Sequence, residues 1–182
     1  MITSNRLSDR ARSWIVAMIA FCCVLIFLVV WTTYATTHTK DRFEQLPAGA
    51  TGTLAESTFR VLELKQTEVM TDGEDQHPSD ANEVWVVATM DLTLSHPVRN
   101  PTCTLELVAE GNRTWEPVTT EFFDRSLPQY CGGDTDEHPI KVGQPWRFEQ
   151  VFRVPTRFVD HIYGVALVDH GTAAPMKVLR PA

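Results

Sequence analysis

An uninterrupted apolar stretch near the N-terminus is the longest hydrophobic run in the chain. It extends from Trp14 to Trp31 without a charged side chain, and the next charge along the chain is Lys40. As an α-helix, Trp14–Trp31 measures about 27 Å, close to the roughly 30 Å hydrocarbon core of a bilayer. Trp14, Trp31 and Tyr34 stand near its two ends, where amphipathic aromatic rings favour the headgroup region. The pattern predicts a transmembrane helix over residues 14–35.

The charges before this stretch predict its orientation. Three arginines and one aspartate precede it, namely Arg6, Arg10, Arg12 and Asp9. Because positive charge is retained on the cytoplasmic side, residues 1–13 are expected in the cytoplasm and the C-terminal part outside the plasma membrane. A cleaved signal peptide is the alternative. Its apolar region normally has about 7 to 15 residues, and the triplet at 33–35 is a poor cleavage site, so the anchor is favoured.

After a polar spacer at 36–52, apolar residues recur at every second position. In the clearest segment, Val84 to Leu94, the even-numbered residues are all apolar. The odd-numbered residues include both polar and apolar side chains, as in a half-buried strand. Further strands are predicted over 58–64, 103–109, 115–118, 146–154, 162–168 and 176–179. Turn residues separate them, and no amphipathic helix is evident. The pattern predicts an all-β, immunoglobulin-like β-sandwich over residues 53–182, preceded by one transmembrane helix.

The cysteines divide between the two regions. Cys22 and Cys23 fall in the apolar stretch, where cysteine acts as a small hydrophobic residue. Cys103 and Cys131 fall in the outer domain, where disulfides persist, and we expect them to pair. Such a bond would stabilise the domain by about 3 to 4 kcal/mol. A metal site is less consistent with the spacing, because neither cysteine has a second ligand two to four residues away.

Composition and motifs narrow the function classes. The chain of 182 residues is 43% hydrophobic and 21% charged, which suits a packed domain, and its net charge is -7. An acidic outer domain excludes nucleic acid as a partner, since phosphate binding needs clustered Lys and Arg. There is no G-x-S-x-G motif, phosphate-binding glycine loop or dinucleotide fingerprint. We therefore expect that the protein binds no cofactor and is not an enzyme. An extracellular hydrolase is the remaining enzymatic alternative.

Two connections are rich in carboxylates, residues 71–82 and 132–139. In the second, Asp134 and Asp136 are spaced like carboxylate ligands and His138 is near, so they are a candidate calcium or zinc site. Neither segment fits the full calcium-loop pattern, and a solvated acidic loop is the simpler interpretation.

Trp85 and Val87 are the apolar residues on the polar face of the clearest strand. Large apolar side chains that face solvent often mark a protein interface, so these two residues are candidate contacts for a partner. Burial beneath the second sheet or a covering loop is the alternative.

Several strand segments carry a family resemblance. The order GTLAESTFRVLELKQTEV, VWVVATMDLTLS, CTLELVAEGNRTWEPV, VGQPWRFEQVFRVP and IYGVALVD resembles the DUF4352-type immunoglobulin-like domains of bacterial lipoproteins and single-pass anchors. This chain departs from that pattern at Cys103, at Cys131, in the acidic insert before Val84 and at Gln144–Pro145. The resemblance implies a non-catalytic extracytoplasmic module and supplies no functional residues.

The expected function is therefore a membrane-anchored binding or accessory module outside the cytoplasm. Its expected partners are the lipid bilayer and another membrane or envelope protein. The alternative is a ligand-binding or calcium-binding domain that uses the acidic loops.

Overall fold

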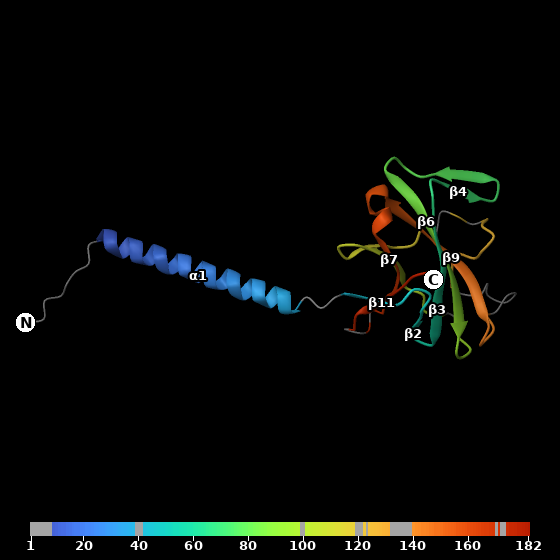
Figure 1. The fold of residues 1–182 in the computed structure, drawn as a ribbon, viewed down its shortest axis with the longest axis horizontal. Coiled ribbons are helices and arrows are strands. Elements are labelled where there is room, and N and C mark those ends of the chain that lie inside the picture. Colours follow the sequence, from blue (N-terminus) through green and yellow to red (C-terminus); the bar gives the residue numbers. More distant parts are fainter. Residues whose placement is uncertain are drawn as a thin grey trace, which may run out of the picture. The chain divides into compact units, whose positions relative to one another are not determined.

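The chain forms two compact units, Met1–Lys40 and Asp41–Ala182, each described here by itself. The computed structural model describes residues 9–38, 42–98, 101–118, 122, 124–131, 140–169, 171 and 174–182. The first unit holds one helix and the second holds the strands (Figure 1).

The helix α1 spans Asp9–His38 and contains the predicted apolar stretch. Its segment Ser13–Tyr34 has 22 residues with a mean hydropathy of 2.9, and none of its side chains is buried. The hydroxyl groups of Thr32 and Thr33 donate to the carbonyl oxygens of residues 28 and 29, at 2.9 and 2.8 Å, which satisfies these polar groups within the helix. A helix that is apolar on every side needs an apolar environment. It is compatible with a membrane anchor or a signal sequence.

The aromatic residues predicted at the membrane boundaries lie near the two ends of this segment. Trp14, Trp31 and Tyr34 are each more than half exposed within the unit, so their rings are available to a surrounding medium. Cys22 and Cys23 are unpaired and exposed in the middle of the same segment.

The second unit consists of two facing sheets and a separate hairpin. In the first sheet the strand order is β1 (Phe43–Gln45), β11 (Met176–Leu179), β10 (Ile162–Leu167), β7 (Leu105–Ala109) and β8 (Arg113–Trp115). In the second it is β2 (Thr51–Leu54), β3 (Ser57–Thr67), β6 (Glu83–Leu94) and β9 (Pro145–Pro155). The hairpin pairs β4 (Val69–Asp72) with β5 (Asp75–Pro78), and a 3₁₀-helix, η1 (Thr156–His161), connects β9 to β10.

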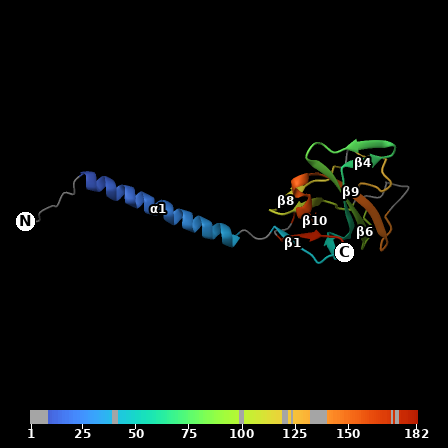
Figure 2. The same cartoon turned by 45° about the horizontal axis from the view of Figure 1, so that its top comes forward.

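The connectivity is that of an immunoglobulin-type sandwich. Strands β6 and β9 are antiparallel neighbours in one sheet, and β11, β10, β7 and β8 follow one another in the other. These positions match strands B and E, and G, F, C and C′, of that fold. The short strand β1 pairs in parallel with β11 at the edge of its sheet (Figure 2). The predicted all-β sandwich preceded by one apolar helix is confirmed.

The core forms where the alternating strands face each other. The even-numbered residues of β6, from Val84 to Leu94, are all buried in one cluster. Phe59, Phe148 and Phe152 join them from the same sheet, while Leu107, Val165 and Leu179 approach from the opposite one. Each of these aromatic and aliphatic side chains is fully buried, so the two inner faces pack as one hydrophobic core.

Two parts of the fold differ from the prediction. Strands β1 and β2 begin inside the expected spacer 36–52, because β1 is held by β11 from the far end of the chain. The acidic connection 71–82 contains most of the β4–β5 hairpin. Gly73 forms its turn with φ of 59°, a left-handed conformation that glycine adopts without strain.

Candidate functional site

The outer face of β6 is covered, so the predicted interface at Trp85 and Val87 is wrong. These side chains are only 3% and 6% exposed, and they pack with Met70, Phe122 and Val151 in a second hydrophobic cluster. Trp85 and Val87 stabilise the domain from within and are not available to a partner.

The cover consists of the β4–β5 hairpin and the segment that we call the cap, residues 122 and 124–131. From the hairpin, the carbonyl oxygen of His77 accepts a hydrogen bond from Trp85 Nε1 at 3.1 Å. From the cap, the Phe122 ring meets the Trp85 ring edge to face at 5.2 Å between centroids, and it meets the His77 ring in the same way at 5.3 Å. The indole is thus both apolar filler and a satisfied hydrogen-bond donor.

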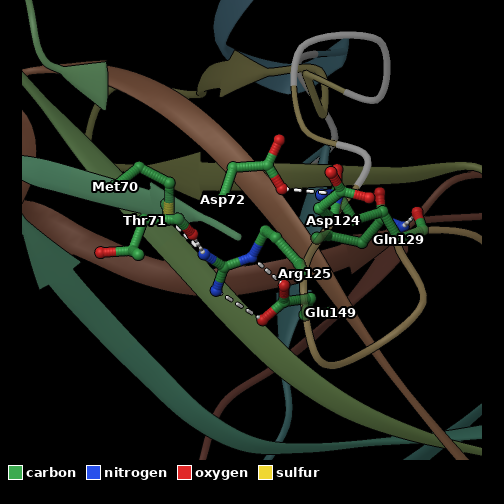
Figure 3. A network of polar contacts seen from close by, with 8 residues as sticks. Met70, Thr71, Asp72, Asp124, Arg125, Gln129 and Glu149 are labelled. Atoms are coloured by element: carbon green, nitrogen blue, oxygen red, sulfur yellow. Dashed lines mark hydrogen bonds and ion pairs between the residues drawn. The ribbon is translucent and has the colours of Figure 1, made fainter. Parts of the chain in front are cut away.

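Arg125 fastens the cap to both the hairpin and the sheet (Figure 3). Its guanidinium forms two hydrogen bonds with the Glu149 carboxylate on β9, the second of which measures 3.0 Å from Nη2 to Oε2. On its other side Nη1 donates to the Thr71 carbonyl oxygen at 2.6 Å and contacts the Met70 sulfur at 2.8 Å. The planar fork of arginine suits this two-sided arrangement, which a lysine could not reproduce.

The ion pair accounts for the burial of a carboxylate. The Glu149 side chain is 5% exposed, and an unpaired charge there would be costly. The hydrogen bond from Glu149, reinforced by its charge and that of Asp72, raises the pKa of Arg125 above its ordinary value against the opposing effect of burial. A raised pKa in the folded state gives stability that is fully present below the unfolded pKa and lost only above the folded one. The Arg125 contribution therefore stays constant through neutral pH.

Further hydrogen bonds attach the cap along the edge of β9. Glu149 N donates to the Pro128 carbonyl oxygen at 2.9 Å, and the Gln150 side-chain amide donates to the Gln129 carbonyl oxygen. Asp124 N donates to Asp72 Oδ1 at 2.7 Å, which holds the hairpin turn against the cap. The cap thus protects an edge that would otherwise be open to pairing.

The Cys103–Cys131 disulfide joins the end of the cap to the chain just before β7. The two Cα atoms are 6.0 Å apart. This is the pairing that the sequence predicts, and it links the cap to the first sheet as Arg125 links it to the second.

A cavity of about 450 Å³ lies beside this disulfide. Its wall comes from four chain segments: the start of β7, the residues that follow β8, the end of the cap, and β9. The lining residues are Cys103, Thr104, Leu105, Glu106, Glu116, Pro117, Gln129, Tyr130, Cys131 and Gln150. The cavity therefore lies where β7 of one sheet and β9 of the other separate, a position suited to binding.

The polar groups of the cavity are incompletely paired. Gln129 is 7% exposed, and neither the oxygen nor the nitrogen of its carboxamide has a hydrogen-bond partner among the described residues. Glu106 Oε2 also lacks a hydrogen bond within that part of the chain, although Arg42 Nη2 lies 3.8 Å away. An unsatisfied buried polar group costs about 1 to 3 kcal/mol, so such groups need an explanation in a native structure.

The predicted metal-binding residues Asp134, Asp136 and His138 lie outside the described residues. Within the part of the chain that is described, no group of three or more His, Cys, Asp or Glu side chains could hold a metal ion. Calcium binding by the acidic loops stays a prediction.

The sequence analysis missed Glu106, Arg125, Gln129 and Glu149. Each is a single polar residue without a motif, and only the fold brings them together. The one available signal was the position of Gln129 and Tyr130 immediately before a cysteine expected to form a disulfide.

Comparison with known proteins yields only a fold-level likeness. No family model matches the chain, and no curated protein matches it. A similar solved structure is an uncharacterized β-sandwich protein from Clostridium difficile 630, with 10% sequence identity and a TM-score of 0.46 over 77% of this chain and 95% of that one. The resemblance to the DUF4352-type domains stays a prediction.

Proposed function

We propose that this protein is a membrane-anchored binding module that acts outside the cytoplasm and contacts another envelope protein. The observation that carries the proposal is the cavity of about 450 Å³ beside the disulfide, lined by Gln129, whose carboxamide has no hydrogen-bond partner among the described residues. Carboxamides, carboxylates and a tyrosine hydroxyl are groups that recognise a ligand by hydrogen bonding and charge.

Separate features support the membrane anchor and the localisation of the domain outside the cytoplasm. The length and hydropathy of Ser13–Tyr34 suit a bilayer span. Arginines before this span favour a cytoplasmic N-terminus, and the Cys103–Cys131 bond suits an oxidising compartment.

The rigid setting of the cavity also supports binding. The disulfide, the Arg125–Glu149 pair and the hydrogen bonds along β9 hold the cap, so its residues Gln129 and Tyr130 are positioned before a partner arrives. Preorganisation of this kind lowers the entropy lost on association.

A photo-crosslinking experiment tests the proposal in native membranes. The full-length protein would carry benzoylphenylalanine in place of Tyr130, which is 49% exposed at the cavity. We expect a discrete adduct with one membrane or envelope protein. The same group at Glu63, an exposed position on β3, should give none. Absence of a protein adduct at position 130, or equal adducts at both positions, would contradict the proposal.

A further inference from the structure

We propose that the cavity beside the disulfide binds an extended peptide segment that carries a basic side chain, and that this segment pairs with the open edge of β7. The inference rests on the proposed function, because it names the part of the partner that the cavity takes.

The first half of β7 lies at an edge of its sheet. Strand β8 pairs only with Leu107–Ala109, which leaves Leu105 without a strand on that side within the described residues. The Thr104 carbonyl oxygen accepts a hydrogen bond from Val168 N on the opposite side, next to β10. Backbone groups alternate along a strand, so the N–H and C=O of Leu105 point toward the cavity side. Leu105 therefore offers one donor and one acceptor in the geometry of a sheet edge.

The course of the chain after β8 leaves this edge without a neighbouring strand among the described residues. After Trp115 the chain leaves β7 through Glu116 and Pro117, and Val118 N then donates to the Val151 carbonyl oxygen on β9, at 2.7 Å. The chain has thus crossed from one sheet to the other, and the cavity occupies the space beside the first half of β7. Proline has no N–H to donate, so Pro117 cannot serve as a donor to this edge.

Gln129 contributes hydrogen-bonding groups to the wall of the cavity. Its carboxamide has one donor group and one acceptor, both unpaired among the described residues, and the residue is 7% exposed. A peptide group presents the complementary acceptor and donor. An added strand would satisfy Leu105 with its main chain and Gln129 with a neighbouring amide, as in recognition by β-strand addition.

The wall of the cavity carries two acidic side chains from the described residues. Glu106 and Glu116 both line the cavity, and the Glu106 carboxylate has an oxygen without a hydrogen bond from the described residues. The nearby cation Arg42 lies 3.8 Å away with its side chain 47% exposed, so the described part of the chain neutralises the acidic side of the cavity only in part. A lysine or arginine of the incoming segment complements these carboxylates. The exposed Tyr130 ring at the rim adds a surface for its aliphatic stem.

A peptide-binding measurement tests the inference with full-length protein in detergent micelles. The probe is a fluorescent heptapeptide that alternates threonine and valine around a central lysine. We expect saturable binding that weakens at least about tenfold when the lysine is replaced by glutamate, or when the central amide is N-methylated. The Gln129→Leu variant should lose affinity by about tenfold. Gln66→Leu, on the exposed part of β3, should bind like the wild type and serves as the matched control.

A charge-reversal variant distinguishes a loss of binding from a loss of the fold. Glu116 is exposed, so Glu116→Lys should leave the fold intact, weaken the lysine peptide and strengthen the glutamate peptide. An affinity for the heptapeptide that is unchanged by peptide charge, by N-methylation and by Gln129→Leu would overturn the inference. So would a cavity occupied by a second copy, seen as concentration-dependent dimer crosslinks from position 130.

The two proposals fail in different ways. If the Tyr130 crosslinker captures an envelope protein and that capture is unchanged by Gln129→Leu and Glu116→Lys, the binding module stands and the peptide site is wrong. If the heptapeptide binds as expected but no membrane or envelope protein is captured, the site stands and the proposed envelope partner is wrong.

Discussion

At the scale of single residues, the buried carboxylate of Glu149 holds the cap on the covered face of the sandwich through its ion pair with Arg125. Glu149 lies on β9, two residues from Val151 of the second hydrophobic cluster, and Arg125 neutralises it from a different part of the chain. Arg147 and Asp91 form a pair of similar geometry, 2.9 Å between Nε and Oδ1, but there the arginine side chain is 55% exposed. The two pairs therefore allow the effect of burial to be separated from that of geometry.

Replacing Arg125 by alanine should lower the free energy of unfolding by about 2 to 4 kcal/mol, because it leaves the Glu149 carboxylate buried and unpaired. The value lies below that of a fully buried pair, since the Arg125 side chain is 16% exposed and partly screened by water. Urea denaturation followed by tryptophan fluorescence measures the loss.

Arg147→Ala is the matched control and should change the unfolding free energy only slightly. Arg125→Lys should give an intermediate loss, because it keeps the charge without the two-pronged hydrogen bonding. Equal effects of Arg125→Ala and Arg147→Ala would show that burial of the pair is unimportant.

At the scale of elements, the cap and the β4–β5 hairpin act as a third layer on a two-sheet sandwich. In Figure 1 the hairpin around β4 lies at one end of the sandwich, beyond β6. Hydrogen bonds and the cluster around Trp85 and Phe122 connect hairpin, cap and sheet, while the disulfide closes the cap on the side of the cavity. Opening the disulfide should therefore affect the cap before the sheets.

The Cys103→Ser, Cys131→Ser double variant should lose about 2 to 4 kcal/mol of stability, since the bond closes a chain segment with a sequence separation of 28. Amide hydrogen exchange should accelerate for Gln129 and Tyr130, while Met90 and Phe148 in the core keep their protection. Mass spectrometry of the exchanged protein measures both regions in one experiment. Uniform acceleration across cap and core would contradict this view of the cap.

At the scale of the whole molecule, the two units differ in where their apolar residues lie. The sandwich buries its apolar residues between two sheets, whereas α1 leaves residues 13–34 exposed along its whole surface. An apolar helix of that length is not stable in water, so it needs an apolar environment such as the core of a bilayer.

Substituting arginine at both Phe21 and Leu25 should release the protein from membranes or prevent its insertion, because each arginine near the centre of the span Ser13–Tyr34 costs about 2.5 to 3.5 kcal/mol. Extraction with alkaline carbonate, followed by immunoblotting of pellet and supernatant, measures the change. Ser13→Arg, at the boundary of the span, should remain in the pellet.

The mass of the wild-type protein distinguishes an anchor from a cleaved leader. Retention of the full 20.5 kDa chain in the carbonate-resistant pellet is the expected result. A shorter, soluble product that lacks α1 would show that the helix is a signal sequence.

The features that depend on local periodicity can be predicted from the order of residues alone. The apolar run from Trp14 to Trp31 was sufficient to predict α1, because length and hydropathy are properties of contiguous residues. The alternation from Val84 to Leu94 placed the inner face of β6 correctly, since a strand turns every second side chain to the same side. The Cys103–Cys131 pairing followed because only two cysteines lie beyond the apolar run.

What covers the other face of β6, and which strand edge lacks a neighbour among the described residues, depends on contacts between distant segments. Alternation tells which residues share a face of a strand, but not which distant segment packs on it. Trp85 was thus predicted at the surface and is buried by His77 and Phe122. The short strand β1 exists because β11 pairs with it, and the cap brings Gln129 to the wall of the cavity. These features arise from long-range contacts, whose formation depends on the free energy of the whole packed chain and not on any local pattern.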